Sequence, residues 1–182
     1  MIEGMVVNEK SLYEMILSRV AQVCEEWEQY GHIVVMTNGC FDLIHPGHAN
    51  FLRTLKHTVT SLLPDLDEER LQLVVAINSD ASVRKLKGAG RPILNERERL
   101  EVVSSLRGVD LAFLFDSVRT VPVLRALAPS LLVKCGKGGF VLDPEEAAVL
   151  SELEIPYLAL EPEFDVSSSD IISRVLECSA HA

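Results

Sequence analysis

Two histidines, His45 and His48, stand close together just after the apolar run 33–37, with Gly47 between them. The run predicts a buried strand of a parallel sheet, and such sheets bind ligands where their strands end, often against a helix N-terminus that favours phosphate. If a helix begins near Gly47, both imidazoles point the same way, and the glycine lets a ligand approach the backbone. Imidazole can donate hydrogen bonds to phosphoryl oxygens as charge builds on them. These residues therefore predict phosphoryl-group chemistry, with His45 and His48 as catalytic residues.

Metal binding is the competing interpretation, because paired histidines bind zinc. No third ligand stands at a suitable spacing, and the four cysteines are far apart without a CxxC pair. Cys135 follows Lys134, but no histidine or other base is adjacent to it, so small-residue packing is favoured over a nucleophilic thiol. We predict no metal site built by the protein itself, and expect Mg²⁺ to enter with the phosphates of the substrate.

Three further groups could hold an anion. Lys134 ends a predicted strand, where a lysine can neutralise a phosphate, although a solvated strand end is the alternative. Three serines, 167–169, precede a predicted helix and also suit a plain N-cap. The segment 84–99 carries six cations against two acids, which is typical either of a solvated face or of an anion site. The cations are Arg84, Lys85, Lys87, Arg91, Arg97 and Arg99.

The elements that position these residues alternate along the chain. Short β-branched or apolar runs predict strands at 32–37, 71–78, 111–115, 131–134 and 157–160. Segments of helical period predict helices near 47–62, 80–86, 96–106, 118–127, 143–153 and 168–178. The pattern favours an α/β fold: one Rossmann-like domain whose five-stranded parallel sheet has helices on both faces. An amphipathic helix at 11–30 precedes it, so we expect an N-terminal helical extension at 1–30 and the main domain at 31–182.

Composition narrows the class of protein. The chain has 182 residues, 48% of them apolar, which suits one domain with one core. Its formal net charge of −10 opposes the basic surface that holds long nucleic acids, so small molecules are the expected partners. Neither a membrane span nor a leader peptide is indicated, and separated free thiols fit the cytoplasm. A homodimer through the N-terminal helix is a further expectation.

The run GCFDLIHPGH (39–48) resembles the GxFDxxHxGH signature of the cytidylyltransferase-like nucleotidyltransferases. Far downstream, VSSSDII (166–172) resembles the (S/T)(S/T)xII motif that opens the last helix of that family. The resemblance implies a Rossmann-like fold and the joining of a nucleoside monophosphate to a phosphorylated substrate with release of pyrophosphate. It also implies that His45 and His48 contact the nucleotide phosphates and stabilise the transition state.

Within the family, the chain is more similar to the adenylyltransferase domain of ADP-heptose synthase over roughly residues 32–176. That domain carries the elements TNGCFD, NSDxSVxxLKGxGRP and LLVKxG, and this chain matches them with TNGCFD (37–42), NSDASVRKLKGAGRP (78–92) and LLVKCG (131–136). The likeness implies transfer of AMP from ATP to a sugar 1-phosphate of the heptose type. It implies nucleotide-binding roles for Asn38, Gly39, Phe41, Asp42, Gly47, Lys56, Asn78, Asp80, Ser167, Ser168 and Ser169. It implies phosphate or substrate contacts for Lys87, Arg91, Arg99, Gly136 and Lys137, with a surface ion pair as the alternative for Arg99.

One segment departs from the heptose enzymes. They read KGGDY after the fourth strand, whereas this chain reads KCGKGGF (134–140), which exchanges an acid for a lysine where the second substrate would bind. A charge reversal changes which acceptor groups can be paired, so the acceptor stays open. The alternatives are a cytidylyltransferase that acts on glycerol phosphate or another alcohol phosphate, and a non-catalytic nucleotide sensor.

Overall fold

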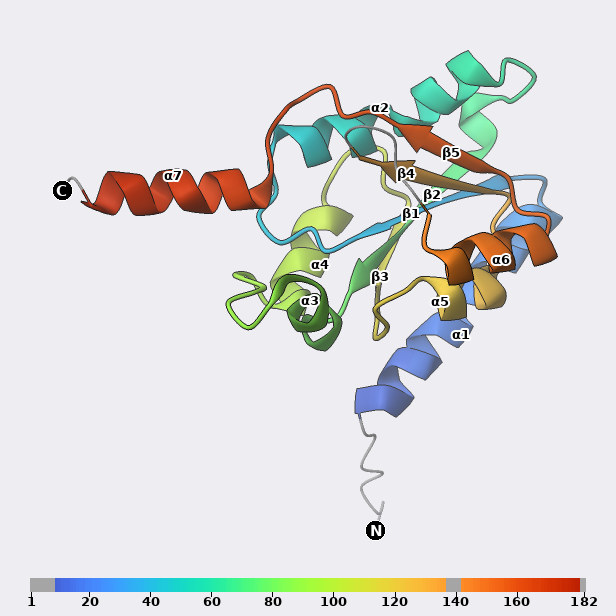
Figure 1. Ribbon diagram of the computed structural model, residues 1–182. Coiled ribbons are helices and arrows are strands. Elements are labelled where there is room, and N and C mark those ends of the chain that lie inside the picture. The colour runs from blue at the N-terminus through green and yellow to red at the C-terminus, as the bar shows by residue number, and fades with distance from the viewer. Residues whose placement is uncertain (1–8, 137–141, 181–182) are drawn as a thin grey trace, which may run out of the picture.

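The computed structural model describes residues 9–136 and 142–180, and within them five parallel strands form one sheet (Figure 1). The strands are β1 (Ile33–Gly39), β2 (Leu71–Asn78), β3 (Leu111–Phe115), β4 (Leu131–Cys135) and β5 (Tyr157–Leu160). They pair in the order β3-β2-β1-β4-β5. The chain thus adds β2 and β3 on one side of β1, and then β4 and β5 on the other side. This arrangement confirms the predicted Rossmann-like α/β fold and creates a switch point between β1 and β4.

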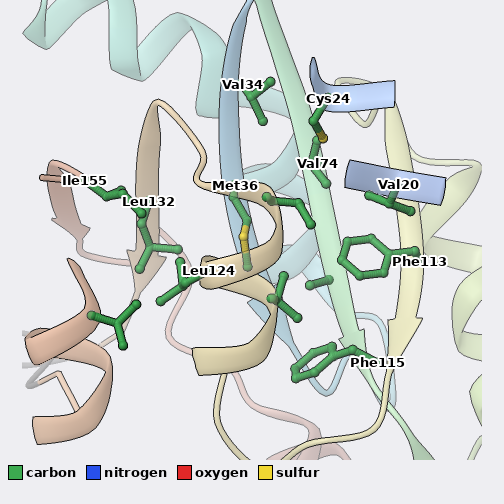
Figure 2. Packing of buried hydrophobic residues seen from close by; sticks show 14 of the residues in the cluster. Val20, Cys24, Val34, Met36, Val74, Phe113, Phe115, Leu124, Leu132 and Ile155 are labelled. Atoms are coloured by element: carbon green, nitrogen blue, oxygen red, sulfur yellow. The ribbon is translucent and has the colours of Figure 1, made fainter. Parts of the chain in front are cut away.

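Both faces of the sheet are covered, which explains why the strands read as continuous apolar runs. Side chains alternate between the faces along each strand. On β1, Val34 and Met36 enter one core cluster, whereas Val35 enters the other. The first cluster lies under helices α1 (Glu9–Gln29), α5 (Val121–Leu127) and α6 (Pro144–Glu152), and Figure 2 shows its packing. The second lies under α2 (Pro46–Leu62) and α4 (Glu96–Ser104).

The N-terminal helix α1 packs on the domain itself. Val20 and Cys24 on its inner side are buried against Phe113 of β3, as Figure 2 shows. Its outer side leaves Leu12 and Met15 exposed, and a homodimer through this helix stays a prediction. None of the helices in residues 9–136 and 142–180 combines the length and apolar content needed to cross a membrane.

One element boundary differs from the sequence prediction by more than two residues, and one segment contains a helix that was not predicted. Helix α5 begins at Val121 rather than near residue 118, because Pro122 suits only the first turn of a helix and Thr120 stands at its N-cap. The segment 63–70, between the helix and the strand predicted at 47–62 and 71–78, contains a short 3₁₀ helix at Glu68–Arg70, whose first turn is capped by the carboxylate of Asp67. The remaining helices are α3 (Asp80–Lys87) and α7 (Ser168–Ala180).

Gly108 allows the α4–β3 connection to pass close to α2. Its φ is +90°, and an added Cβ would lie 2.5 Å from the carbonyl oxygen of Leu52. We expect Gly108→Ala to lower the free energy of unfolding by about 2 kcal/mol, because the substitution adds backbone strain and a clash with backbone atoms. Urea denaturation measures the loss. Gly90→Ala is the matched control, since nothing lies within 4 Å of its added Cβ; equal stability of the two variants would contradict the prediction.

Candidate active site

A cleft of about 450 Å³ opens at the carboxyl ends of β1, β2 and β4, beside the switch point of the sheet. This size is in the range of small-molecule sites. The structure brings most of the residues predicted from sequence to its walls. They are Asn38, Gly39, Phe41, Asp42, His45, His48, Asn78, Lys87, Arg91, Lys134, Ser167, Ser168 and Ser169.

The two histidines stand at the start of α2. His45 is the N-cap residue, with extended backbone (φ −138°, ψ 169°) and no capping hydrogen bond from its side chain. Its ring stacks on that of His48, with centroids 3.8 Å apart and planes 27° from parallel. Neither buried Nδ1 has a hydrogen-bond partner among the residues that the structure describes. Both rings therefore keep hydrogen-bonding capacity at a helix N-terminus, where free N–H groups and the helix dipole favour an anion.

The surroundings favour the neutral form of both imidazoles. Burial and the neighbouring His45 together lower the pKa of His48 to about 4, against a smaller opposing effect of the Leu43 backbone. Burial also lowers the pKa of His45, partly offset by the Asp170 carboxylate. Each neutral ring has one N–H donor and one acceptor, so the rings can donate to phosphoryl oxygens without carrying a formal charge.

Local backbone geometry sets the ring positions. Phe41 has a φ of +48°, a conformation that L residues rarely adopt, and its buried ring lies 5.2 Å from that of His48. A Cβ at Gly47 would come within 3.1 Å of the His45 ring. Gly47 therefore leaves room for the His45 ring, which a larger residue would displace by a few tenths of an ångström. Gly47 itself lines a neighbouring hollow between α2 and the segment after β5.

Helix α7 brings its N-terminus to the same cleft, although Figure 1 shows the rest of the helix leading away from the domain. The Asp170 carboxylate accepts from the backbone N–H and the hydroxyl of Ser167, both at 2.7 Å. The Ser168 hydroxyl donates to the Leu43 carbonyl at 3.1 Å. Ser167 thus caps the helix, as the alternative interpretation predicted, and Ser168 ties the helix to the histidine loop.

Asp42 is a buried acid of the cleft that holds neighbouring segments in place. Its carboxylate is 1% exposed and accepts from Arg91 Nε at 2.5 Å and from the backbone N–H groups of Ile93 and Leu94 at 2.7 and 2.9 Å. These bonds hold the segment after α3 against the histidine loop. Asp42 therefore fixes the position of Arg91 at the cleft.

Arg99 lies beneath the cleft rather than on the surface. Its side chain is 0% exposed and pairs with Asp80 at 2.8 Å, which excludes the surface ion pair considered as the alternative. Lys56 is also away from the cleft lining, because its ammonium pairs with Asp110 at 2.6 Å. Gly136 donates its backbone N–H to Leu160 and does not line the cleft. Lys137 lies outside the described residues.

Sequence reasoning missed one acid in the cleft. Glu146, in the first turn of α6, is buried and lies 3.4 Å from Lys134 Nζ. An acid near the start of a helix usually faces solvent and favours the helix dipole, so nothing in the sequence distinguished it from Glu145. The described residues hold no group of three or more histidine, cysteine or acidic side chains arranged to bind a metal ion.

The sequence profile of the cytidylyltransferase-like family matches residues 36–174. The chain belongs to the cytidylyltransferase-like family of nucleotidyltransferases. The matched stretch begins in β1 and ends in α7, so it contains both histidines, Lys134 and the serines of the cleft.

Curated relatives agree with this membership. The chain is 44% identical over 118 residues to the bifunctional protein HldE of Gluconobacter oxydans, which covers 65% of this chain and 22% of that protein. It is 36% identical over 161 residues to the bifunctional protein HldE of Desulfatibacillum aliphaticivorans, covering 87% of this chain and 30% of that protein. The chain thus spans less than a third of either relative.

A solved structure has a similar fold. The crystal structure of the lipopolysaccharide core biosynthesis protein from Thermoplasma volcanium matches with a TM-score of 0.54 and 25% sequence identity. The match covers 72% of this chain and 98% of that one. Almost the whole of that protein is therefore matched, whereas part of this chain has no counterpart in it.

Proposed function

We propose that this chain transfers AMP from ATP to the phosphate of a sugar 1-phosphate of the heptose type, releasing pyrophosphate. The observation that carries the proposal is the meeting of the stacked histidines, Lys134 and the N-terminus of α7 around one cleft. The choice of a heptose-type acceptor rests on the likeness to the adenylyltransferase domain of ADP-heptose synthase and on the relatives named HldE.

In the proposed reaction, the triphosphate lies between His45, His48 and the start of α7, and Mg²⁺ arrives with the nucleotide as part of the substrate. An oxygen of the acceptor phosphate attacks the α-phosphorus in line. The bond from the α-phosphorus to the oxygen bridging to the β-phosphate breaks, and pyrophosphate leaves with that electron pair. No covalent intermediate on the protein is required.

The side chains have separate roles in this reaction. His45 and His48 donate hydrogen bonds to phosphoryl oxygens as negative charge builds on them. Lys134, Lys87 and Arg91 lower the repulsion between two anionic reactants. Holding both reactants in one cleft supplies several kcal/mol of the barrier reduction, about 7 to 11 in well-oriented cases. The four cysteines that the structure describes are all unpaired, which supports a reducing compartment, and we propose the cytoplasm.

A pyrophosphate-release screen tests the proposal. The full chain is incubated with ATP or CTP and Mg²⁺ against heptose 1-phosphate, other sugar 1-phosphates and glycerol phosphate, and products are identified by mass spectrometry. We expect ATP with a sugar 1-phosphate to give pyrophosphate and an ADP-sugar, and a chelator to stop the reaction. Turnover of CTP with glycerol phosphate would replace the proposal by the cytidylyltransferase alternative. ATP binding without pyrophosphate from any acceptor would indicate a nucleotide sensor.

A further inference from the structure

Glu146 is held rigidly at the edge of the cleft. Its Oε1 accepts from the backbone N–H of Thr120 at 2.8 Å and from the Thr120 hydroxyl at 2.5 Å. Its side chain is 7% exposed. Two donors from one residue at the N-cap of α5 fix the orientation of the carboxylate, and the second oxygen, Oε2, is directed to the end of β4.

Lys134 lies near the carboxyl end of β4 and faces Oε2 of Glu146. Its Nζ lies 3.4 Å from Glu146 Oε2 and also donates to the side-chain oxygen of Asn38, at the end of β1. Its side chain is 6% exposed. The ammonium therefore sits at the switch point, held by one residue from α6 and one from β1. A buried ammonium needs a paired acid, since burial alone favours the neutral amine.

We propose that Glu146 is a positioning residue, which holds the Lys134 ammonium charged and oriented toward the nucleotide phosphates in the cleft. The inference rests on the proposed function for the role of Lys134. Glu146 acts through Lys134, because Thr120 holds its Oε1 and its Oε2 faces the Lys134 ammonium. Thr120 extends the chain of contacts and keeps the carboxylate from turning into the cleft.

The groups around Lys134 determine how the removal of Glu146 would change the pKa of Lys134. Burial lowers the pKa of Lys134, and Glu146 raises it in opposition. Burial and then Glu146 raise the pKa of the neighbouring Tyr157. Cys135 is adjacent on β4, and burial raises the pKa of its thiol, so it is neutral at neutral pH. The other titratable or charged groups that line the cleft are Cys40, Asp42, His45, His48, Lys87 and Arg91.

The expected pH effect of Glu146→Gln comes from the titration of Lys134. The charged form of Lys134 is lost as pH rises through its pKa, and without Glu146 the effect of burial stands alone, so this loss moves to lower pH. We expect Glu146→Gln to lower kcat/KM by about tenfold at neutral pH, the usual scale for a lost contact to a charged group. We also expect the alkaline limb of its pH–rate profile to fall at lower pH than in the wild type.

Glu145→Gln is the matched control, because this neighbouring acid is 64% exposed and pairs with Arg119 at 3.3 Å on the surface. It is expected to keep the wild-type rate and pH profile. In a Lys134→Met background, Glu146→Gln is expected to cost little further activity, since its effect passes through Lys134. If Glu146→Gln folds poorly, Thr120→Val tests the same contact and is expected to shift the alkaline limb in the same direction to a smaller extent.

A second readout does not depend on turnover. In protein labelled with carbon-13 at lysine Cε, the resonance absent from Lys134→Met reports the titration of Lys134 by NMR. We expect this titration at lower pH in Glu146→Gln than in the wild type and unchanged in Glu145→Gln. An unchanged titration and alkaline limb in Glu146→Gln would overturn the positioning role. Failure of the wild type to release pyrophosphate would instead overturn the proposed function, and the NMR result would still decide the role of Glu146.

Discussion

Replacing His48 with alanine is expected to lower the turnover number for pyrophosphate release by about 10² or more, the usual cost of one donor to developing charge. The ring lies at a helix N-terminus, is held between His45 and Phe41, and has an Nδ1 without a partner among the described residues. Substitution by alanine removes the proposed hydrogen bond from the His48 ring to a phosphoryl oxygen, and it disturbs neither a strand nor a helix cap. Steady-state and single-turnover kinetics with ATP and the acceptor found in the screen measure the loss.

His57→Ala is the control for this substitution. His57 lies on the same helix, its side chain is 77% exposed, and it faces Glu68 at 3.3 Å on the surface. It is expected to keep the wild-type turnover. A His48→Ala protein that folds normally and turns over at the wild-type rate would exclude the proposed transition-state role.

The stability of His48→Ala is also expected to depend on pH differently from that of the wild type under acidic conditions. The pKa of His48 is about 4 in the folded protein against an ordinary value of 6.5. As pH falls below 6.5, the unfolded chain takes up this proton first, so His48 lowers the stability of the fold increasingly as pH approaches 4. Urea midpoints of His48→Ala are therefore expected to fall less between these pH values than those of the wild type.

Replacing Arg99 with alanine is expected to lower the free energy of unfolding by about 3 to 5 kcal/mol, the range for removing one partner of a buried ion pair. The guanidinium donates to the carbonyl oxygens of Cys40 at 2.5 Å, Asn78 at 2.7 Å and Leu94 at 3.1 Å. It also pairs with Asp80. It thus joins the ends of β1 and β2 to the start of α4, and its loss leaves buried acceptors unpaired.

Urea denaturation measures this loss, with Arg97→Ala, an exposed position on the same helix, as the control. Arg99→Lys is expected to lie between wild type and Arg99→Ala, because lysine keeps the charge but cannot supply the forked set of donors. Equal stability of Arg99→Ala and Arg97→Ala would contradict the role assigned to this side chain. Since Cys40 and Asn78 both line the cleft, nucleotide affinity is expected to fall in Arg99→Ala as well.

Strand positions and the fold class were predictable from sequence because each depends on a short window of residues. The run 71–78 was predicted as a strand and is one, since both of its faces are buried and its residues other than Gln72 and Asn78 are apolar. The histidine motif was predictable for the same reason, as a strand, a tight turn and a helix start follow within a few residues. The start of α5 was misplaced because bends at 118–120 precede the first helical turn, which contains Pro122.

The burial of charged residues was not predictable. Arg99 follows three other charged residues at the start of α4, and only the fold shows that its side of the helix faces the strand ends. Glu146 has the sequence context of an ordinary first-turn acid. Burial of such residues depends on which backbone carbonyls and charges stand opposite them, and these come from distant segments.

Sequence by itself determined the nature of the elements, the family and the nucleotide-binding motif, because periodicity, turn residues and a compact motif are local properties. Tertiary structure decided which charges share the cleft. Asn38 and Lys134 are separated by 96 residues and meet because the strand order places β4 directly beside β1. The physical reason is that parallel pairing across a switch point brings together strand ends that no local pattern relates, and with them the Glu146 carboxylate that holds Lys134.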